Sequence, residues 1–270
     1  MARHNKEDAP ALWLKCENPR CEATVYKKAV EERLQVCPEC DYHFSLSAPE
    51  RLQITLDPDT FEERHADLAP TDPLGFRDLQ TYPDRLARYQ KQTGLKDAVL
   101  CGRGKIEGRD IMIAVMDSRF IMASMGSVVG EKITRITEDA TEASLPLIIF
   151  CASGGARMQE GALSLMQLSK TSSAVARFRE KGGLYIAVLT HPTTAGVMAS
   201  FASLGDLIIA EPHALIGFTG ERVIKETLKT ELPDGFQTSE FMLEHGFLDM
   251  VVHRMAMREQ LALLLDYLAR

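Results

Sequence analysis

From Cys101 onward, apolar runs of the kind that form buried strands alternate with helical stretches. The runs occupy residues 111–116, 147–151, 184–189, 207–210 and 215–218. Two stretches with helical patterns, residues 127–143 and 157–181, separate the first three runs. This order requires crossover connections between strands of one sheet. It predicts a layered α/β fold.

The two helical stretches differ in their apolar pattern. Apolar residues of the first stretch step by four, three, four and three, which places them on one helix face: Val129, Ile133, Ile136, Ala140 and Ala143. The first half of the second stretch is apolar on several sides, through Ala162, Leu163, Leu165, Met166 and Leu168. We therefore expect that half to be deeply packed. A shorter amphipathic pattern predicts another helix over residues 82–92.

Four of the six cysteines lie close together near the N-terminus, at Cys16, Cys21, Cys37 and Cys40. Two short knuckles that each supply two thiolates are typical of a tetrahedral zinc site. The residues between them, 25–26 and 34–36, are expected to pair as two short strands. The spacing predicts a four-cysteine zinc ribbon with a closed, structural ion, and the alternative is four unrelated buried thiols.

Charge and apolar content limit the classes of protein that fit. The formal net charge is −7, which disfavours a molecule built as a whole to attract polyanions, although a local basic patch remains compatible with it. No apolar run approaches the roughly 18 residues that span a bilayer. The N-terminal MARHNKEDAP lacks the apolar run of a signal peptide. We expect a cytoplasmic protein without a membrane span, in which clustered cysteines bind metal.

Small residues follow two consecutive strand-like runs. They form SGGARMQEG at residues 153–161 and HPTTAGVMASFASLGD at 191–206, and a third such segment, SMGSVVG, spans 124–130. None is a phosphate-binding Walker or GxGxxG loop. Because the carboxyl ends of parallel strands share one sheet edge, we expect the first two loops to lie together at a ligand crevice. They could stabilise a transient anion, or serve only close packing and turn geometry.

Side-chain chemistry near these loops is sparse. Ser153, His191 and Asp206 could form a nucleophile–base–acid triad, but their spacing does not support one. Arg157 and Glu160 are expected to be structural. Cys101 and Cys151 are expected to be core residues rather than nucleophiles. We therefore expect backbone donors to act in the site, with the base supplied by a cofactor or substrate.

Longer motifs, in a fixed order, resemble one family. They are the ribbon with CPEC, SMGSVVGEKI, SGGARMQEG, PTTAGV, FASLGD, AEPHALIGFTGERVI and LPDGFQTSEFMLEHGFLD. Together they closely resemble the β subunits of bacterial acetyl-CoA carboxylase carboxyltransferase, from about residue 12 to the end. The resemblance implies a crotonase-like (ClpP/crotonase) ββα spiral with an N-terminal four-cysteine zinc ribbon. The composition of the chain changes near residues 46 and 101. With the resemblance, these changes divide it into a C4-type zinc ribbon at 12–45, a charged helical connecting segment at 46–100 and a carboxyltransferase core at 101–270.

The resemblance also implies an activity and partners. A subunit of this family moves the carboxyl group from carboxybiotin, on the biotin carboxyl carrier protein, to acetyl-CoA and makes malonyl-CoA for fatty acid biosynthesis. It is active only with a carboxyltransferase α subunit of the same fold, in an α2β2 heterotetramer with the site between the two. ATP would be used by the partner biotin carboxylase and not bound by this chain.

Site residues carry over onto matching positions. The resemblance assigns an oxyanion hole to Gly154, Gly155, Ala195 and Gly196, which are the candidate catalytic residues. It assigns substrate binding to Gly126, Ser127 and Ala156. Two enolates, of biotin and of acetyl-CoA, would need oxyanion holes, and neither would need a protein general base. The hole for biotin would come from the α subunit.

Three positions depart from the family pattern. Four residues rather than two separate Cys16 from Cys21, which should preserve zinc binding and change the ribbon geometry. Ala195 replaces the usual glycine; it is strained by about 1 kcal/mol or more if φ must be positive, and harmless if only its N–H is used. We expect the second case. Ala123 also replaces a frequent glycine, with little expected effect.

Two other classes compete with the carboxyltransferase. One is a zinc-ribbon nucleic-acid-binding regulatory protein on a crotonase-like scaffold, motivated by Lys15, Arg20, Lys27, Lys28 and Arg33. The net charge opposes strong binding of nucleic acid, although the two functions could coexist. The other class is a serine peptidase of the same fold that uses Ser153.

Overall fold

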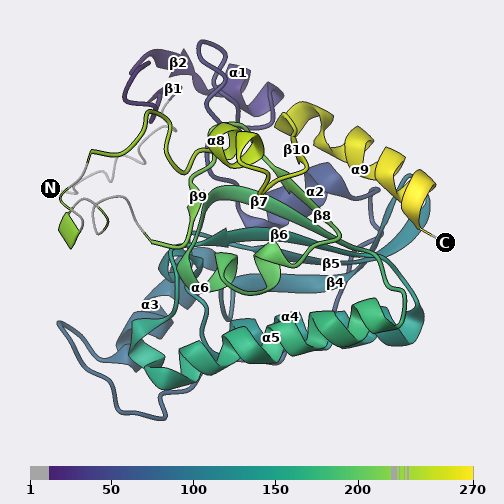
Figure 1. Cartoon of the computed structure of the whole chain (residues 1–270). Helices are drawn as coiled ribbons and strands as arrows, with labels where there is room; N and C mark the ends of the chain where they lie inside the picture. Colours follow the sequence, from purple (N-terminus) through teal and green to yellow (C-terminus); the bar gives the residue numbers. More distant parts are fainter. Residues whose placement is uncertain (1–11, 220–223, 225, 228, 230, 270) are drawn as a thin grey trace, which may run out of the picture. The chain divides into compact units, whose positions relative to one another are not determined.

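The computed structural model describes residues 12–219, 224, 226, 227, 229 and 231–269. Two sequence features fall partly or wholly outside them: the N-terminal stretch that lacks a signal-peptide pattern, and the end of AEPHALIGFTGERVI. The chain divides into two compact units, with the boundary between Ser45 and Leu46 (Figure 1). No helix among the described residues is both long and apolar enough to cross a membrane.

The first unit is a small two-stranded element followed by one helix. Strand β1 (Trp13–Lys15) pairs antiparallel with β2 (Thr24–Tyr26), and α1 (Lys27–Glu32) follows directly. The predicted pairing of residues 25–26 with 34–36 is wrong. Leu34 and Gln35 have φ angles of 55° and 63°, so the chain turns out of α1 there and leaves only Val36 to bridge, to His43.

The second unit is built on one mixed sheet with the order β10-β8-β7-β6-β5-β4-β3, and β9 pairs with the end of β7. The strands are β3 (Glu62–Glu63), β4 (Val99–Ile106), β5 (Arg109–Met116), β6 (Leu147–Ser153), β7 (Tyr185–Thr194), β8 (Leu207–Ala210), β9 (Ile216–Gly217) and β10 (Met250–Val251). Strands β4 and β5 form an antiparallel hairpin, whereas β5, β6, β7 and β8 run parallel. The parallel order confirms the predicted crossovers.

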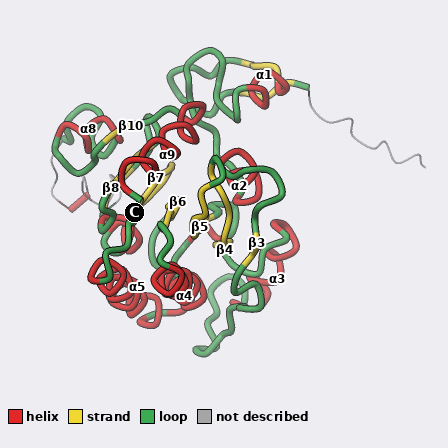
Figure 2. The backbone as a smooth tube through the Cα atoms, turned by 90° about the vertical axis from the view of Figure 1, so that its right-hand side faces the viewer, coloured by secondary structure: helices red, strands yellow, loops and turns green. Residues whose placement is uncertain are grey.

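Helices cover both faces of this sheet, which makes the predicted layered α/β architecture (Figure 2). Those on one face are α3 (Tyr82–Thr93), α4 (Ser127–Ala143) and α5 (Ala162–Glu180); those on the other are α2 (Ala48–Thr55) and α9 (Arg254–Leu268). Each face of the sheet has its own hydrophobic core, and alternate residues of β6 contribute to one or the other. Ile149 packs toward α4, and Ile148 and Phe150 pack toward α2 and α9. Short helices α6 (Ala195–Met198) and α8 (Ser239–Glu244) follow β7 and β9.

The first predicted helix is confirmed, whereas the second needs two corrections. Residues 127–143 form α4 as predicted. Residues 157–181 do not form one helix, because a 3-10 turn (Met158–Glu160) comes first and Gly161, with φ 53°, breaks the backbone before α5. The predicted deep packing of its first half is also wrong. Leu165 and Met166 are 60% and 62% exposed, so the apolar side of this half faces outward.

Candidate functional site

The two small-residue loops lie against each other where β6 and β7 end, as their parallel order predicts. Ser153 pairs with Thr193 across the two strands. A Cβ placed on Gly155 would lie 3.1 Å from Ala195 Cβ, and one placed on Gly196 would lie 3.8 Å from Ala156 Cβ. The candidate residues 154–156 and 195–196 therefore share one small region.

A third segment, from Met122 to Gly126, runs beside the first loop and binds its backbone. The Gly154 N–H donates to the Met122 carbonyl at 2.8 Å. The Met125 N–H donates to the Gly155 carbonyl at 2.8 Å, and the Arg157 N–H donates to the Met125 carbonyl at 2.9 Å. The loop is thus fixed on one side by a short parallel bridge.

These bonds decide which amides are available to a ligand. The Gly154 N–H is occupied by Met122, and the Gly155 N–H donates to Ser153 Oγ at 3.0 Å. The N–H groups of Ala156 and Gly196 have no acceptor among the residues that the structure describes. The first loop therefore offers a donor at Ala156, a residue expected to bind substrate, rather than at either glycine.

Left-handed backbone is concentrated around the loops. Gly155 has φ 124°, and Ala195 has φ 50°. The expectation that alanine is harmless at position 195 is therefore wrong, because the turn from β7 into α6 requires a positive φ there, at a cost of about 1 kcal/mol. Ile121, Met122 and Ala123, with φ of 45°, 53° and 48°, form one left-handed turn directly before the bridge. Strain of this kind clusters at functional sites.

Threonine hydroxyls, which sequence reasoning missed, fasten the second loop to the first strand. The hydroxyls of Thr190 and Thr193 donate to the Cys151 carbonyl at 2.9 and 2.8 Å, and the Thr194 hydroxyl donates to the Ser153 carbonyl at 2.9 Å. These bonds satisfy carbonyls where the strand pairing shifts register between Cys151 and Ser153. The THPTT stretch was the available signal, because threonines at a strand end can bond to backbone.

A buried polar network lies beneath the first loop. The Arg157 guanidinium, fully buried, donates to both Asp97 carboxylate oxygens at 2.6 and 2.8 Å and to the Tyr82 hydroxyl at 3.2 Å. It also donates to the Ser124 carbonyl at 2.7 Å. Burial lowers the pKa of Arg157, but the Asp97 charge and hydrogen bonds outweigh it, so the net shift is upward and the side chain stays charged. The expected structural role of Arg157 fits these contacts.

Glu160 joins the same network from the other end of the loop. Tyr82 donates its hydroxyl to Glu160 Oε1 at 2.7 Å, and Ser127 donates its N–H and its hydroxyl to Oε2 at 2.6 and 2.5 Å. Burial raises the pKa of Tyr82, which keeps it a neutral donor. Glu160 therefore caps α4, and it leaves the Ser127 N–H already bonded, which weighs against the expected contact of Ser127 with substrate.

The serine-peptidase arrangement is not assembled. Ser153 is fully buried, and its hydroxyl bonds to the Gly155 backbone. His191, which is exposed, accepts from the Leu215 N–H. Asp206 accepts from the Tyr185 N–H, at the opposite end of β7 from Ser153. The three side chains therefore belong to different environments. Cys151 is a buried core residue as expected, and burial raises the pKa of its thiol.

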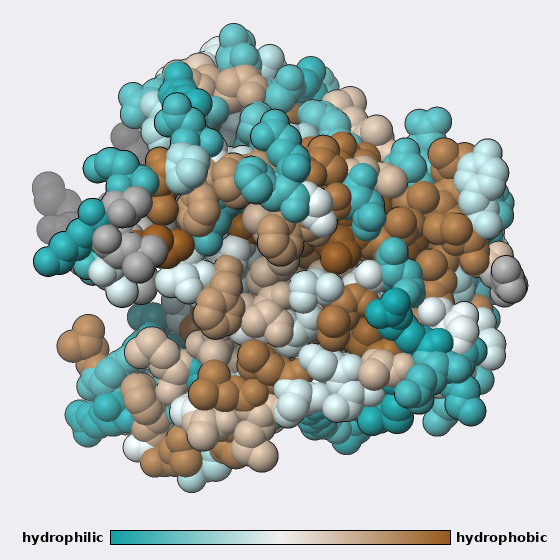
Figure 3. Space-filling model, in the orientation of Figure 1, coloured by the Kyte–Doolittle hydropathy of each residue, from teal (hydrophilic) through white to brown (hydrophobic). Residues whose placement is uncertain are grey.

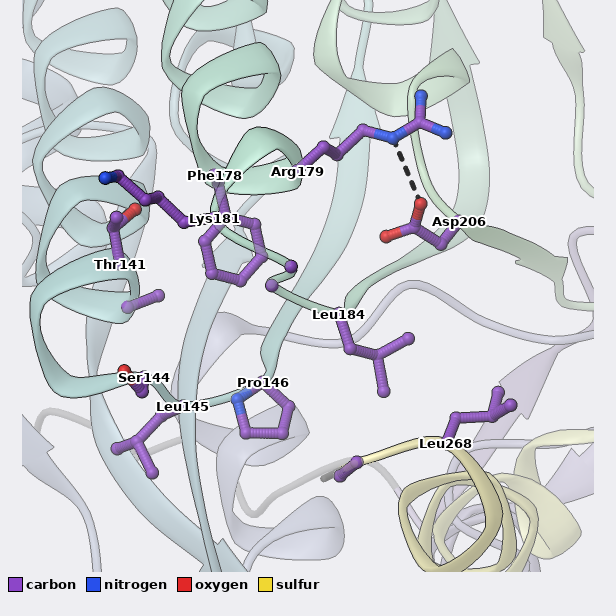
Figure 4. Close-up of a pocket in the computed structure, with 14 residues that line it drawn as sticks. Thr141, Ser144, Leu145, Pro146, Phe178, Arg179, Lys181, Leu184, Asp206 and Leu268 are labelled. Carbon is purple, nitrogen blue, oxygen red and sulfur yellow. Dashed lines mark ion pairs between the residues drawn. The ribbon is translucent and has the colours of Figure 1, made fainter.

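One cavity lies away from the loops, at the edge where β6 and β7 begin (Figure 4). Its volume is about 730 Å³, and the C-terminal ends of α4, α5 and α9 line it. Arg179 and Asp206 form an ion pair at 3.1 Å on one wall. The glycine loops contribute nothing to this cavity, so it is not the candidate site.

The four clustered cysteines fit a zinc ion. Their Sγ atoms all lie within 4.8 Å of one another, and those of Cys16 and Cys40 are 3.7 Å apart. A zinc tetrahedron with bonds of about 2.3 Å has edges of about 3.8 Å, so this spacing matches. Burial raises the pKa of the Cys16 thiol to about 12, so a bound cation is needed to hold it as thiolate. The longer first knuckle closes through Asn18, whose carbonyl accepts from the Cys21 N–H.

Comparison with known proteins assigns the family. The carboxyl transferase domain family matches residues 45–268. The chain belongs to the carboxyl transferase family. A second match, to the acetyl-CoA carboxylase zinc finger domain, covers residues 13–40 and the four cysteines. The family match and the cysteine geometry together assign a structural zinc ribbon to the N-terminal unit.

Relatives in the carboxyl transferase family cover almost the whole chain. The acetyl-coenzyme A carboxylase carboxyl transferase subunit beta of Rhodopirellula baltica is 56% identical over 98% of this chain and 85% of its own length. The protein of the same name from Synechococcus sp. (strain RCC307) is 56% identical over 96% of this chain and 89% of its own length. The chain is thus similar to these subunits throughout both units.

Two solved structures share the fold of this chain. Transcarboxylase 12S, with methylmalonyl-coenzyme A and methylmalonic acid bound, is 29% identical with a TM-score of 0.67, over 82% of this chain and 40% of that one. The Pseudomonas malonate decarboxylase hetero-dimer, 21% identical, has a TM-score of 0.63 over 83% of this chain and 86% of that one, and shows the fold alone. The predicted crotonase-like α/β core and zinc ribbon are confirmed, and the protein is a carboxyltransferase-type enzyme.

Proposed function

We propose that this chain is the β subunit of an acetyl-CoA carboxylase carboxyltransferase. It transfers the carboxyl group from carboxybiotin, on the biotin carboxyl carrier protein, to acetyl-CoA and yields malonyl-CoA for fatty acid biosynthesis in the cytoplasm. The observation that carries the proposal is the 56% identity to subunits of that name over 98% of the chain. The proposed organisation is a ribbon at 12–45, a connecting segment at 46–100 and a catalytic core at 101–270.

The reaction sets the chemistry that the loops must supply. The C–N bond of carboxybiotin breaks, a C–C bond forms between the carboxyl carbon and the acetyl methyl carbon, and the methyl proton passes to biotin. The thioester oxygen of acetyl-CoA gains negative charge during this exchange, so preorganised N–H donors lower the barrier. A protein general base is not required, in keeping with a first loop whose Arg157 and Glu160 side chains are buried and bonded to other protein groups.

We assign the donors for that oxygen to the Ala156 and Gly196 amides. Both N–H groups have no acceptor among the described residues, and the two residues adjoin across the loops. The N–H groups of Gly154 and Gly155 are already bonded within the protein, so these two residues do not donate to the oxygen. Together with Ala195 they shape the hole. Gly126 sits at the edge of the same region, beside Glu160.

An exposed apolar surface borders the loops and favours a two-chain site. Met122, Met158, Leu165 and Met166 are 64%, 75%, 60% and 62% exposed, and apolar side chains gather over the N-terminal half of α5 (Figure 3). Contiguous exposed apolar surface of this kind marks protein–protein contacts. We assign it to the carboxyltransferase α subunit, whose own hole would hold biotin, in an α2β2 assembly that works with biotin carboxylase. That partner consumes the ATP.

The ribbon gives little support to nucleic-acid binding as the main function. Four of its five cationic side chains have an acidic partner: Lys15–Glu22 at 3.2 Å, Lys27–Glu31 at 3.7 Å, Lys28–Glu32 at 3.8 Å and Arg33–Asp41 at 2.6 Å. These pairs reduce the positive charge that phosphate contacts need.

Reconstitution tests the proposal directly. The chain is mixed with a carboxyltransferase α subunit, carboxybiotin and acetyl-CoA, and malonyl-CoA is measured; a panel of longer acyl-CoA substrates follows. We expect malonyl-CoA only when both subunits are present. Full activity of the isolated chain would show that the two-chain site is wrong, and no activity with the partner would show that the activity is wrong.

A further inference from the structure

We propose that Glu160 and Tyr82 are positioning residues for carboxyl transfer. Their shared hydrogen bond holds the first glycine loop against the start of α3, and the bonds from Ser127 to the same carboxylate hold it against the start of α4. The inference rests on the proposed function, because that loop carries the Ala156 amide. Tyr82 is fully buried and Glu160 is 1% exposed, so both act through the segments that they join rather than by contact with substrate.

A single carboxylate joins three elements that are far apart in sequence. Glu160 ends the loop, Tyr82 is the first residue of α3, and Ser127 is the first residue of α4. Both Glu160 oxygens are used, one by the Tyr82 hydroxyl and the other by the Ser127 N–H and hydroxyl. Movement of the loop would leave the Ser127 donors and the buried Tyr82 hydroxyl without this acceptor, which is unfavourable.

Arg157 extends the same chain of bonds to the middle of the loop. Its guanidinium donates to the Tyr82 hydroxyl at 3.2 Å and to both oxygens of Asp97, which is 1% exposed. The Tyr82 hydroxyl therefore accepts from Arg157 while it donates to Glu160. The loop is held at residues 157 and 160, on the C-terminal side of Ala156, and the bridge to Met125 holds it directly before and after Ala156.

Burial of these charges is not explained by stability alone. Well-packed apolar residues of similar volume often give equal or greater stability than a buried ion pair. A network of two carboxylates, a guanidinium and a tyrosine hydroxyl instead fixes one geometry, since each member needs its partners at a set distance. That property is useful where a displacement of about 1 Å in a donor costs about 100-fold in rate.

Gly126 supplies an independent sign of the same arrangement. Its φ of −110° is available to any residue, so the backbone does not require glycine. A Cβ at this position would lie 2.4 Å from Glu160 Oε1 and 2.8 Å from its carboxyl carbon. The close approach of the carboxylate to the α4 N-terminus is thus what the missing side chain allows.

The test uses the assembled two-subunit enzyme with Tyr82→Phe and Glu160→Gln. Tyr82→Phe removes one oxygen and keeps the ring. We expect kcat for malonyl-CoA formation to fall about tenfold or more, with KM for acetyl-CoA changed less than about threefold, because positioning acts in the transition state. The effects of the two changes should be less than additive in the double variant, since both act on the same bonded pair. Tyr89→Phe, on the same helix, is the matched control and should retain full kcat.

The outcomes separate this inference from the proposed function. An active wild-type complex whose Tyr82→Phe variant keeps kcat within about twofold would overturn the positioning role. A Glu160→Gln complex that is faster than wild type would also overturn it, because loss of a negative charge near the enolate would then dominate. If Glu160→Gln does not assemble, Tyr82→Phe decides alone. An inactive wild-type complex would instead refute the proposed function.

Discussion

At the scale of single residues, Gly155 and Ala195 face each other across the two loops in left-handed backbone. Gly155 at φ 124° occupies a region that side chains rarely enter, whereas Ala195 at φ 50° lies in the region that non-glycine residues tolerate at moderate cost. The 3.1 Å from a Gly155 Cβ position to Ala195 Cβ is tighter than an ordinary methyl contact, so a second methyl group would require a small shift. The two positions should therefore respond differently to the same exchange of glycine and alanine.

We predict that Ala195→Gly is tolerated and Gly155→Ala is not. Ala195→Gly relieves left-handed strain but adds freedom to the unfolded chain, so the unfolding free energy should change by less than about 1 kcal/mol and activity should persist. Gly155→Ala combines a strained backbone with a tight contact and should lower kcat about tenfold or more. Thermal unfolding and steady-state rates check both. Equal activity of the two variants would mean that the loop geometry has been assigned to the wrong residues.

At the scale of elements, the β4–β5 hairpin depends on a carboxylate outside it. Asp57 accepts from the N–H groups of Glu107 and Gly108 at 2.9 and 2.8 Å and from Arg258 at 2.6 Å. The Gly108 N–H, followed by Glu107 and Arg258, outweighs partial burial and lowers the pKa of Asp57. A lowered pKa in the folded state adds stability above the unfolded pKa of about 3.9, and that stability is lost as pH falls further.

Asp57→Asn should therefore lower stability at neutral pH by about 1 kcal/mol, because one amide oxygen replaces two charged acceptors. The difference between wild type and variant should shrink as the pH falls below about 4, where the wild-type carboxyl becomes protonated. Urea unfolding of both proteins at a series of pH values measures this difference in unfolding free energy. Asp59→Asn, two residues away, is the control. A difference that stays constant down to pH 3 would contradict the proposed charge effect.

The ribbon is the element that depends on metal. Its core consists of a few side chains, among them Cys16, Val25, Val30 and Cys37, so zinc supplies much of its folding energy. The single tryptophan of the chain, Trp13, lies on β1 with its ring 5.5 Å from Tyr26. Removal of zinc by a chelator should change Trp13 fluorescence and release about one ion per chain. Re-addition of zinc should restore the signal. An unchanged spectrum after complete zinc loss would show that the ribbon folds without it.

Elements with a regular apolar period could be predicted from the sequence, and those set by single glycines or by partners could not. The steps from Val129 to Ala143 placed α4 correctly, because one face of that helix packs on the sheet. The break at Gly161 has no signature beyond the glycine itself. The exposure of Leu165 and Met166 could not be predicted. An apolar helix face has the same sequence pattern whether the core of its own chain or another chain covers it.

At the scale of the whole molecule, parallel strand order was enough to predict that the two loops meet. The buried network was not predictable, because Arg157 and Asp97 are 60 residues apart and Tyr82 and Glu160 are 78 residues apart, with no pattern that links them. In the sequence, its charged members cannot be distinguished from ordinary surface charges. The zinc ligands were predictable, since thiol chemistry and short spacing carry the information locally.

Assembly gives the last prediction, because the apolar surface on α5 lies beside the loops. Met166→Asp places a charge at the centre of the proposed contact, and we expect it to weaken binding of the α subunit by about tenfold or more. Stability of the isolated chain should not change, since Met166 is 62% exposed. Ser173→Asp, an exposed position on the same helix, is the matched control and should bind normally. Sedimentation with increasing α subunit gives both affinities. Equal binding by the two variants would show that the α subunit binds another face of this chain. The second half of the active site would then lie at that other face.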